Sequence, residues 1–576
     1  SFVATTPPLL TPGQRAAWDT LRAQIESGQA ARTFLLHGVT GSGKTEIYLR
    51  AIERILELGA SAIALVPEIA LVPQTVRRFM ARFPDRVALV HSGLTDGEQY
   101  DTWRRARAGE IGVVIGTRSA LFTPLPNLRL IVLDEEHDDS YKQSPPIPPP
   151  YYHARDVAMA LLRPVGGTLI LGSATPSVTT YFQAQNSEIG YIHLPDRVLA
   201  HREVITRQAR ELQAQVPAVV AANYVPADAP DAMSAPLPPV EVVDMRHELK
   251  AGNRSMFSRS LRTALDDVLA LNEQAILLLN RRGSASFVLC RDCGYVAKCP
   301  RCDMPFTYHE ASEKLVCHHC GYRAAQPEIC PQCGSPRIRY FGAGTATVEA
   351  AVKKEFPLAR AIRWDRDTTR ARGSHDDILD RFVAGEANVM IGTQMIAKGL
   401  DLPRVTLVGV ILADTGLGLP DYRAGERSFQ LLTQVAGRAG RGPLGGRVVL
   451  QTYQPDHYAI RAAARHDYPM FYAQEIDYRR LLRYPPFKRL VHLRYGDSNA
   501  ATVQREAERA FERLKSRVAE RGLTATELVG PAPAFFGRID NVFYWHILAR
   551  TTEPSRLLEG LDLRGWSVDI DPLDVL

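Results

Sequence analysis

An eight-residue run near the N-terminus has the composition of a phosphate-binding loop. Residues Gly38 to Thr45 read GVTGSGKT and fit the pattern G-x-x-x-x-G-K-[ST] at every fixed position. Glycines let backbone N–H groups close around phosphates, and the N-terminus of a following helix adds a positive dipole end. We expect Lys44 to reach the β- and γ-phosphates of a nucleotide and the Thr45 hydroxyl to ligate Mg²⁺. The expected nucleotide-binding residues are Gln14, Gly38, Gly41, Ser42, Gly43, Lys44 and Thr45.

Gln14 enters this set because of its place ahead of the glycine-rich run. A glutamine there can read the edge of an adenine through its side-chain amide, which both donates and accepts hydrogen bonds. The alternative interpretation is a surface glutamine at the start of a short helix.

Two adjacent carboxylates follow a second apolar run. Leu130–Leu133 predicts a buried strand, and it ends in Asp134 and Glu135. A carboxylate at the end of a strand beside a phosphate-binding loop can hold the water shell of Mg²⁺, and the next one can orient the attacking water. We therefore assign Asp134 to Mg²⁺ and Glu135 to the water. A solvated acidic turn is the alternative.

A late glycine-rich stretch offers cationic partners for the same phosphates. Residues Gln434 to Arg441 read QVAGRAGR, and Arg438 and Arg441 share one face of a helix or turn. Arginines that reach across a cleft to a γ-phosphate stabilise the charge of the transition state by ~10³–10⁵ in rate. A surface ion pair is the alternative use of these arginines.

Eight cysteines, all in one short segment, form four C-x₂-C pairs that predict two closed zinc sites. The first two pairs are too close along the chain to fold onto one another, so we expect a nested arrangement. Structural Cys₄ sites leave no position open for catalysis. Iron–sulfur ligation is the alternative, and His309, His318 and His319 are expected to be bystanders. The outer site would be Cys290, Cys293, Cys330 and Cys333, and the inner site Cys299, Cys302, Cys317 and Cys320.

Elements that position these residues follow an alternating pattern. Apolar strands alternate with helical patterns on both sides of the cysteine segment, which indicates two parallel α/β blocks. The block after the cysteines has no phosphate-binding loop and is interpreted as a partner lobe. We divide the chain into a first lobe (1–200), a flexible linker (201–239), a second lobe in two parts (240–289 and 336–455), the cysteine-rich insert (290–335) and a C-terminal α+β domain (456–576).

Composition narrows the class of protein. The 576 residues are 45% hydrophobic and 23% charged, which is ordinary for a globular chain of several domains. We find no long apolar run and no signal peptide, so we expect no membrane partner and a cytoplasmic protein. A net charge of +6 is compatible with a polyanionic partner. The first residue is Ser1 rather than Met, which indicates a fragment.

A stretch rich in aromatic and basic residues follows the acidic pair. Tyr141–Gln143 and Tyr151–Asp156 mix aromatics with Lys and Arg, as a surface that stacks bases and holds phosphates does. The residues between them, 144–150, are expected to form a stiff polyproline II segment. A merely structural loop is the alternative.

Taken together, these motifs resemble those of superfamily 2 helicases and, within them, the primosomal replication-restart family, PriA. The eight-cysteine insert after Asn280-Arg281-Arg282-Gly283 is the most specific shared feature. The other matching runs are Gly38–Thr45, Val66–Ile69, Gly116–Arg118, Asp134–His137, Gly172–Pro176, Gly392–Met395, Lys398–Gly399 and Gln434–Arg441.

This resemblance implies two RecA-like P-loop NTPase lobes with a zinc-binding insert and a C-terminal α+β domain. It implies an ATP-dependent 3′–5′ DNA helicase that remodels stalled forks and initiates replication restart, with ATP, Mg²⁺ and two Zn²⁺ as cofactors. Implied partners are single-stranded and forked DNA, single-strand binding protein and the primosome proteins that load the replicative helicase. A monomer in the bacterial cytoplasm, at the nucleoid, is expected. Tyr141–Asp156 would couple DNA to ATP hydrolysis.

Three departures from the family qualify this expectation. The family's N-terminal 3′-end-binding and winged-helix domains have no counterpart here, which indicates truncation or a loss of fork-end recognition. Prolines occupy 145, 146 and 148–150, and Ala346 stands where the family usually has Glu. Two other functions therefore stay open: a duplex DNA translocase, and a DNA-binding restart scaffold with weak or no helicase activity.

Overall fold

A computed structural model defines the fold of most of the chain. It describes residues 7–28, 30–67, 73–145, 147–201, 225–226, 232–234, 236–279, 286–301, 304–309, 314–318, 320–341, 344–365, 368–369, 374–397, 402–440, 444–573 and 575. Within these residues no helix is both long enough and apolar enough to span a bilayer.

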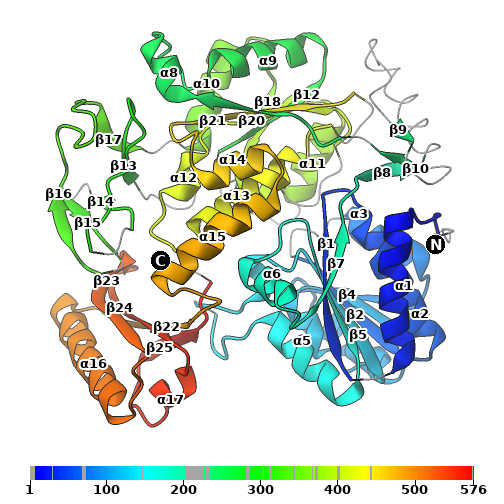
Figure 1. The fold of residues 1–576 in the computed structure, drawn as a ribbon. Helices are drawn as coiled ribbons and strands as arrows, with labels where there is room; N and C mark the ends of the chain where they lie inside the picture. The colour runs from blue at the N-terminus through cyan, green and yellow to red at the C-terminus, as the bar shows by residue number, and fades with distance from the viewer. Residues whose placement is uncertain are drawn as a thin grey trace.

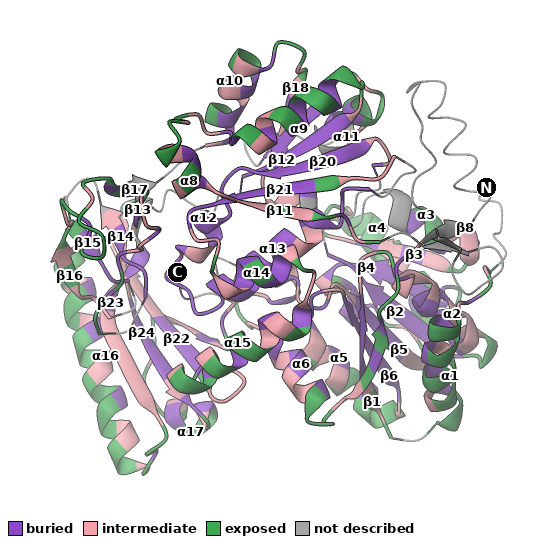
Figure 2. Cartoon of the chain, turned by 45° about the horizontal axis from the view of Figure 1, so that its top comes forward, coloured by how far each residue is buried: buried purple, intermediate pink, exposed green. Residues whose placement is uncertain are grey.

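Lobe 1 is a seven-stranded parallel sheet in the order β3-β4-β2-β5-β6-β1-β7. Its inner strands are short, apolar and mostly buried, as expected of a parallel sheet covered on both faces, and the edge strands β3 and β7 are partly exposed (Figure 2). The strands are β1 (Arg32–Gly38), β2 (Ser61–Leu65), β3 (Val87–Val90), β4 (Val113–Gly116), β5 (Leu128–Asp134), β6 (Thr168–Ser173) and β7 (Gly190–Leu194). The helices are α1 (Pro12–Ser27), α2 (Lys44–Glu57), α3 (Pro73–Arg82), α4 (Asp96–Arg107), α5 (Ala154–Leu162) and α6 (Val178–Gln185).

Lobe 2 is a six-stranded parallel sheet in the order β11-β21-β20-β12-β19-β18. Its strands are β11 (Val240–Asp244), β12 (Gln274–Leu278), β18 (Ala361–Trp364), β19 (Val389–Gly392), β20 (Val405–Val410) and β21 (Arg447–Thr452). Its helices are α8 (Met245–Lys250), α9 (Arg259–Ala270), α10 (Thr345–Glu355), α11 (Ser374–Val383), α12 (Asp414–Leu417), α13 (Ala424–Ala436), α14 (Tyr458–Ala464) and α15 (Tyr468–Leu482). Both lobes are RecA-like, which confirms the predicted fold class.

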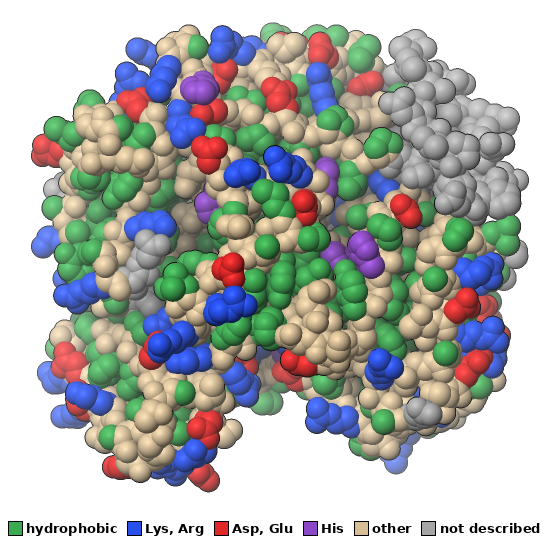
Figure 3. Space-filling view, in the orientation of Figure 1, with side chains coloured by type: hydrophobic (Ala, Val, Ile, Leu, Met, Phe, Trp, Pro, Cys, Tyr) green, Lys and Arg blue, Asp and Glu red, His purple; other side chains and the backbone are tan. Residues whose placement is uncertain are grey.

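Two antiparallel sheets complete the molecule on the side away from α1 (Figure 1). The insert sheet contains β13 (Ser286–Cys290), β14 (Thr307–His309), β15 (Lys314–Val316), β16 (Arg323–Ala325) and β17 (Ile338–Phe341). The C-terminal sheet contains β22 (Arg489–Asp497), β23 (Glu527–Ile539), β24 (Val542–Thr551) and β25 (Trp566–Ile570), with α16 (Ala500–Glu520) and α17 (Pro554–Leu558). A notch separates the C-terminal domain from lobe 1 in the space-filling view (Figure 3).

The segment predicted to be a flexible linker lies largely outside the described residues. Its described parts form a small sheet with the end of lobe 1, made of β8 (Val198–His201), β9 (Val225–Pro226) and β10 (Ala232–Ser234). The described residues also include the short 3₁₀ helices η2 (Arg118–Phe122), η3 (Asp139–Tyr141), η4 (Arg163–Val165) and η5 (Gln394–Ala397).

The two lobes share one apolar core where they meet. Leu171 of lobe 1 and Phe429 of α13 belong to the same buried cluster, together with Tyr468 of α15. The Tyr468 hydroxyl donates to the Pro176 carbonyl at 2.9 Å, and its ring lies 4.9 Å from that of Tyr181 in α6. Helix α15 therefore fastens lobe 2 to lobe 1, and it runs through the centre of the molecule (Figure 1).

A close approach between β6 and α2 fixes the base of the predicted site. A Cβ placed on Gly172 would lie 1.5 Å from the Tyr48 hydroxyl oxygen, and Tyr48 is 1% exposed. Only glycine fits beside this buried ring.

We predict that Gly172→Ala destabilises the protein by ~1–3 kcal/mol, because the added methyl group overpacks the site of the Tyr48 ring. Denaturant unfolding monitored by circular dichroism measures the change. Gly13→Ala is the matched control, because a Cβ at that helix position would have no atom of the described chain within 4 Å. Equal stability of the two variants would contradict the account.

Candidate functional site

The phosphate-binding loop has the predicted strand–loop–helix form. Strand β1 ends at Gly38 and helix α2 begins at Lys44. Gly41 and Gly43 have φ values of 84° and 82°, a left-handed conformation that disfavours residues with a side chain. The Lys44 ammonium donates to the Gly38 carbonyl at 2.8 Å, so it lies over the loop that it is predicted to serve. Thr45 follows in the first turn of α2.

Gln14 is buried and bonded to this loop. Its amide nitrogen donates to the Ser42 carbonyl at 2.9 Å, and its amide oxygen accepts from the Thr11 backbone N–H at 3.1 Å. A Cβ on Gly43 would lie 2.3 Å from the Gln14 amide nitrogen. Gln14 is thus no surface residue: it caps α1 and braces the phosphate loop. Its contact with adenine stays a prediction.

The acidic pair ends β5 directly beside the loop. The Tyr48 hydroxyl donates to Asp134 Oδ1 at 3.1 Å. Burial first, and then the Glu135 carboxylate, raise the pKa of Asp134 to about 6, against the lowering effect of Lys44. Glu135 has a φ of 49°, an unfavourable value for a residue with a side chain. The Asp134 and Glu135 carboxylates lie close together near the phosphate-binding loop. A divalent cation fits between them, because its positive charge would relieve their repulsion.

Glu136 and His137 carry the acidic turn to neighbouring elements. Glu136, 2% exposed, accepts from the Ser177 backbone N–H at 2.6 Å, where α6 starts. His137 Nδ1 lies 2.8 Å from Ser173 Oγ, and its Nε2 lies 2.7 Å from the Gln434 amide nitrogen of lobe 2. With the Gln434 amide as donor, Nε2 of His137 accepts and its Nδ1–H donates to Ser173. His137 therefore joins the acidic turn to α13.

The end of α13 reaches the phosphate loop itself. A Cβ on Gly437 would lie 3.1 Å from the Thr40 hydroxyl oxygen. Arg438, the next residue, is 7% exposed. Arg441 lies outside the described residues. One helix of lobe 2 thus contacts both the acidic turn and the phosphate loop of lobe 1.

Arg197, which lies in no recognised motif, connects the phosphate loop with the residues that follow α13. The Val198 backbone N–H donates to the Gly41 carbonyl at 2.8 Å. The Arg197 guanidinium, 4% exposed, lies 3.4 Å from the Gly440 carbonyl, beyond α13. A Cβ on Gly41 would lie 3.2 Å from the Arg197 side chain. Sequence reasoning missed Arg197, since a lone arginine after a strand carries no pattern.

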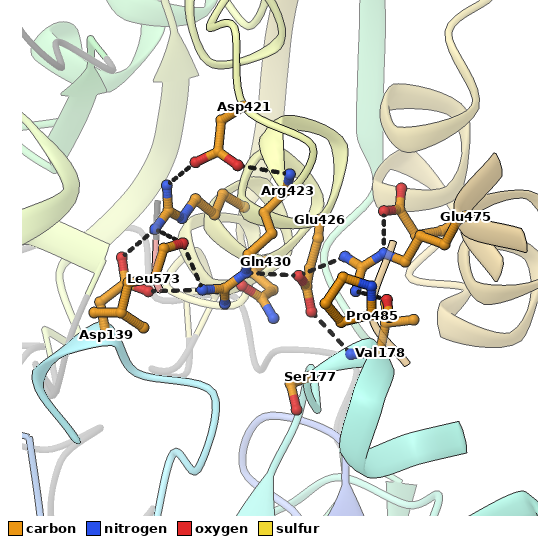
Figure 4. A network of polar contacts seen from close by, with 12 residues as sticks. Asp139, Ser177, Val178, Asp421, Arg423, Glu426, Gln430, Glu475, Pro485 and Leu573 are labelled. Atoms are coloured by element: carbon orange, nitrogen blue, oxygen red, sulfur yellow. Dashed lines mark hydrogen bonds and ion pairs between the residues drawn. The ribbon is translucent and has the colours of Figure 1, made fainter. Parts of the chain in front are cut away.

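A buried ion network holds α13 against lobe 1 (Figure 4). Glu426, at the start of α13, accepts from the Val178 backbone N–H of α6 at 2.8 Å. It also forms ion pairs with Arg479 at 2.8 Å and Arg423 at 3.1 Å. Burial alone would raise the pKa of Glu426, but Arg479 and Arg423 bring it down to about 2. Glu475 binds the other side of Arg479 at 2.8 Å.

The loop after the acidic turn, residues 138–153, contradicts one expectation. The Gln143 backbone N–H donates to the Tyr152 carbonyl at 2.8 Å, and the Ile147 N–H lies 3.2 Å from the Ser144 carbonyl. A stiff polyproline II segment over 144–150 would separate its ends by ~20 Å, at ~3.1 Å per residue. The segment instead turns back on itself, because backbone bonds close its two ends.

The same loop is fastened to the acidic turn and to η2. The buried Tyr141 hydroxyl donates to the Asp134 carbonyl at 2.6 Å. The Arg118 guanidinium donates to the carbonyls of Ser140 at 3.0 Å and Lys142 at 2.6 Å. It also lies over the Tyr152 ring, 5.6 Å from the centroid. The loop thus has a defined position relative to the predicted catalytic carboxylates.

The cysteines gather into the two predicted clusters. Each cluster has its sulfur atoms within 4.8 Å of one another, and Cys302 of the inner cluster lies outside the described residues. In the outer cluster the Cys290–Cys333 sulfur distance is 3.7 Å, and in the inner cluster Cys299–Cys320 is 3.6 Å. The outer cluster is Cys290, Cys293, Cys330 and Cys333, and the described inner one is Cys299, Cys317 and Cys320.

This donor set fits a tetrahedral metal with soft ligands. Burial first, and then the neighbouring thiols, raise the pKa of Cys320 to about 11, which a bound cation would reverse. His318 Nδ1 lies 3.3 Å from the Pro533 carbonyl, so its ring serves the C-terminal domain. His319 lies outside the described residues, as does the side chain of His309.

Four family models match successive parts of the chain. They are DEAD/DEAH box helicase (11–182), PriA DNA helicase Cys-rich region (299–324), helicase conserved C-terminal domain (341–443) and primosomal protein N C-terminal domain (480–573). Fold and matches together define a helicase-class chain with both RecA-like lobes and a zinc ribbon. The chain belongs to the PriA family of replication restart proteins.

Curated relatives carry this assignment. A replication restart protein PriA of Synechocystis is 44% identical across 100% of this chain and 66% of its own length. The Bacillus subtilis protein is 44% identical across 96% of this chain and 64% of its own length. The Chlamydia pneumoniae protein is 39% identical across 100% of this chain and 73% of its own length. The chain thus spans about two thirds of the length of these relatives.

We predict that the purified protein contains two zinc ions per chain. Cys330→Ser should remove only the outer ion and Cys317→Ser only the inner one, because each cluster holds its own metal and serine is a poorer ligand than thiolate. Metal analysis by mass spectrometry counts the ions. Loss of both ions from either variant, or one ion in the unaltered protein, would contradict the nested pairing.

We predict that Glu426→Gln destabilises the protein by ~3–5 kcal/mol near neutral pH, because it removes the carboxylate that Arg423 and Arg479 share and leaves each buried guanidinium with one counter-charge fewer. Asp477→Asn is the control, since its ion pair with Arg480 is 70% and 60% exposed and is worth ~0–1 kcal/mol. Denaturant unfolding of each variant measures the difference.

The same substitution has a defined pH dependence. The pKa of Glu426 is lower in the folded protein, about 2, than its ordinary value of 4.5. Its stabilisation is therefore complete above pH 4.5 and is lost as the pH falls toward 2. The stability gap between the unaltered protein and Glu426→Gln should shrink across that window, and a constant gap would contradict the buried ion pair.

Proposed function

We propose that this chain is an ATP-dependent DNA helicase that moves 3′ to 5′, remodels stalled forks and initiates replication restart. One observation carries the proposal: α13 of lobe 2 contacts the phosphate loop through Gly437 and the acidic turn through Gln434. A nucleotide held there would touch both lobes, so its hydrolysis can change how they meet. Family membership supports the choice of DNA as the track.

Roles at the nucleotide follow from chemistry and position. Lys44 and the loop N–H groups of Gly41, Ser42 and Gly43 would hold ATP phosphates, with Gln14 bracing the loop. Thr45 and Asp134 would hold Mg²⁺, which neutralises charge on the transferred phosphoryl group. Glu135 would orient the attacking water. Arg438 and Arg441 would approach the γ-phosphate from lobe 2.

Zinc ions in the two cysteine clusters would be structural. A Cys₄ site has no open position, so each ion stabilises the insert and takes no part in catalysis. The insert would act as one unit beside the C-terminal domain, because the His318 carbonyl accepts from His546 Nε2 at 2.6 Å. We keep the predicted domains as part of this proposal, with lobe 2 extended to include α14 and α15 and the insert extended to include β13 and β17.

The 138–153 loop would couple DNA binding to the nucleotide site. Its half-buried Tyr151 and Tyr152 rings suit a single strand, whereas Tyr141 and Lys142 are buried against the protein. The Tyr141 hydroxyl bonds to the backbone of Asp134. Forked DNA, single-strand binding protein and helicase-loading proteins are the proposed partners, and the bacterial nucleoid the proposed location.

ATP hydrolysis with and without forked DNA tests the proposal. We expect DNA to stimulate hydrolysis, and Lys44→Ala to lower the stimulated kcat by at least ~100-fold, because it removes a charge that stabilises the transition state. Lys353→Ala is the control: that lysine is 59% exposed and forms an ion pair with Glu349 of its own helix, α10.

Three results would contradict parts of the proposal. A rate of ATP hydrolysis that DNA does not change would refute the coupling of DNA binding to hydrolysis. Stimulated hydrolysis without strand displacement on forks that carry a 3′ tail would indicate a duplex translocase. DNA binding with no hydrolysis at all would indicate a restart scaffold.

A further inference from the structure

The last strand of the C-terminal domain grips the 138–153 loop of lobe 1. The Lys142 ammonium forms an ion pair with Asp569 Oδ1 at 2.8 Å and donates to the Ile570 carbonyl at 2.8 Å. The Lys142 and Asp569 side chains are only 4% and 6% exposed. The Tyr151 hydroxyl lies 3.2 Å from Ser567 Oγ of the same strand. Two residues of the loop are thus held by one strand.

Asp569 is well placed to act as a fixed anchor. It lies in β25, where it pairs with His492 of β22 inside the four-stranded sheet. Strand β25 is an edge strand of that sheet in the described part of the chain, and its Ile570 carbonyl receives the Lys142 ammonium. An anchor in a sheet moves only when the whole domain moves.

The other side of the grip is the predicted catalytic turn. Tyr141 and Lys142 are adjacent, yet their side chains serve opposite partners: Lys142 binds β25, and the Tyr141 hydroxyl bonds to the carbonyls of Asp134 at 2.6 Å and Leu65 at 3.0 Å. A shift of β25 that draws on Lys142 therefore acts on Tyr141 and on the backbone of Asp134. The path from domain to carboxylate is two residues long.

A second tie links the same strand end to lobe 2. The Leu573 carbonyl accepts from Arg427 at 2.9 Å and from Arg423 at 3.1 Å. Both arginines form ion pairs with Asp139 of the loop, at 3.2 and 3.5 Å (Figure 4). The end of the chain thus meets the loop and α13 together, at the junction that the proposed ATP cycle would open and close.

Because the Lys142–Asp569 ion pair is buried, it fixes the position of the loop more than it raises the stability of the protein. A desolvated ion pair gains little net stability, but removal of one partner leaves a charge that must leave the site. The pair therefore holds the loop in one position, and a neutral substitution at either end releases it.

We propose that Asp569 is a positioning residue that fixes Lys142, and through it the 138–153 loop and the acidic turn, so that the C-terminal domain sets how strongly DNA stimulates ATP hydrolysis. This inference rests on the proposed function for its kinetic consequence. Its structural part, the grip on the loop, stands independently.

Kinetics of Lys142→Met, Asp569→Asn and the double variant test the consequence. Each single variant should lower the DNA-stimulated kcat by about tenfold, with the KM for ATP and the DNA-free rate within about twofold of the unaltered protein. The DNA-stimulated kcat of the double variant should be no lower than that of the less active single variant, because both substitutions break the same contact. Effects that multiply, or stimulation that survives both substitutions, would overturn the proposal.

The matched control is Asp571→Asn. Asp571 lies two residues further along, and its ion pair with Arg489 is exposed and stays within the C-terminal domain. It should leave stimulation unchanged. An equal loss in this control would show that any damage to the end of the chain suffices, and would overturn the role of Asp569.

Hydrogen exchange without nucleotide or DNA tests the grip itself. In Asp569→Asn, and in the neutral double variant that leaves no unpaired buried charge, amides of 138–153 should exchange about tenfold faster while those of the phosphate loop stay unchanged. Unchanged exchange in both variants would overturn the proposal. Faster exchange in a protein whose unaltered form shows no DNA-stimulated hydrolysis would uphold the grip and refute the proposed function.

Discussion

The burial of one carboxylate, Glu426, sets how the two lobes meet. A charge taken out of water must be compensated, and here two guanidinium groups and one backbone N–H of α6 do so. Those partners come from both lobes, so the charge is satisfied in only one arrangement. Since Glu426 starts α13, the same arrangement brings the far end of that helix to the phosphate loop, through Gly437, and to the acidic turn, through Gln434.

The C-terminal domain joins the same polar layer. Arg423 serves Glu426 on one side and the Leu573 carbonyl on the other, so the ion network continues into the end of the chain. From there Asp569 reaches back to lobe 1 through Lys142. Lobes and C-terminal domain are thus positioned by a few desolvated charges, which define geometry more than they add net stability. A substitution at one of these charges therefore affects both lobes and the C-terminal domain.

Sequence patterns predicted the features that depend on residues close together in the chain. The phosphate loop, the acidic pair after β5 and the strands of the two parallel sheets other than β7 follow from spacing and periodicity, and the nested cysteine clusters follow from short intervals along the chain. What the patterns missed depends on contacts between distant residues: Arg197 with Gly440, and Lys142 with Asp569. The prolines of 144–150 misled for another reason, because local propensity was overridden by the backbone bond between Gln143 and Tyr152.

We propose that lobe 2 completes the phosphate site of lobe 1 through the end of α13. Thr40→Cys with Gly437→Cys tests it most directly, since a Cβ on Gly437 would lie 3.2 Å from the Thr40 Cβ, within reach of a disulfide. Mild oxidation should link residues 40 and 437, as peptide mapping by mass spectrometry would show, and the link should block ATP turnover. Failure of these two cysteines to cross-link, with or without nucleotide, would contradict it.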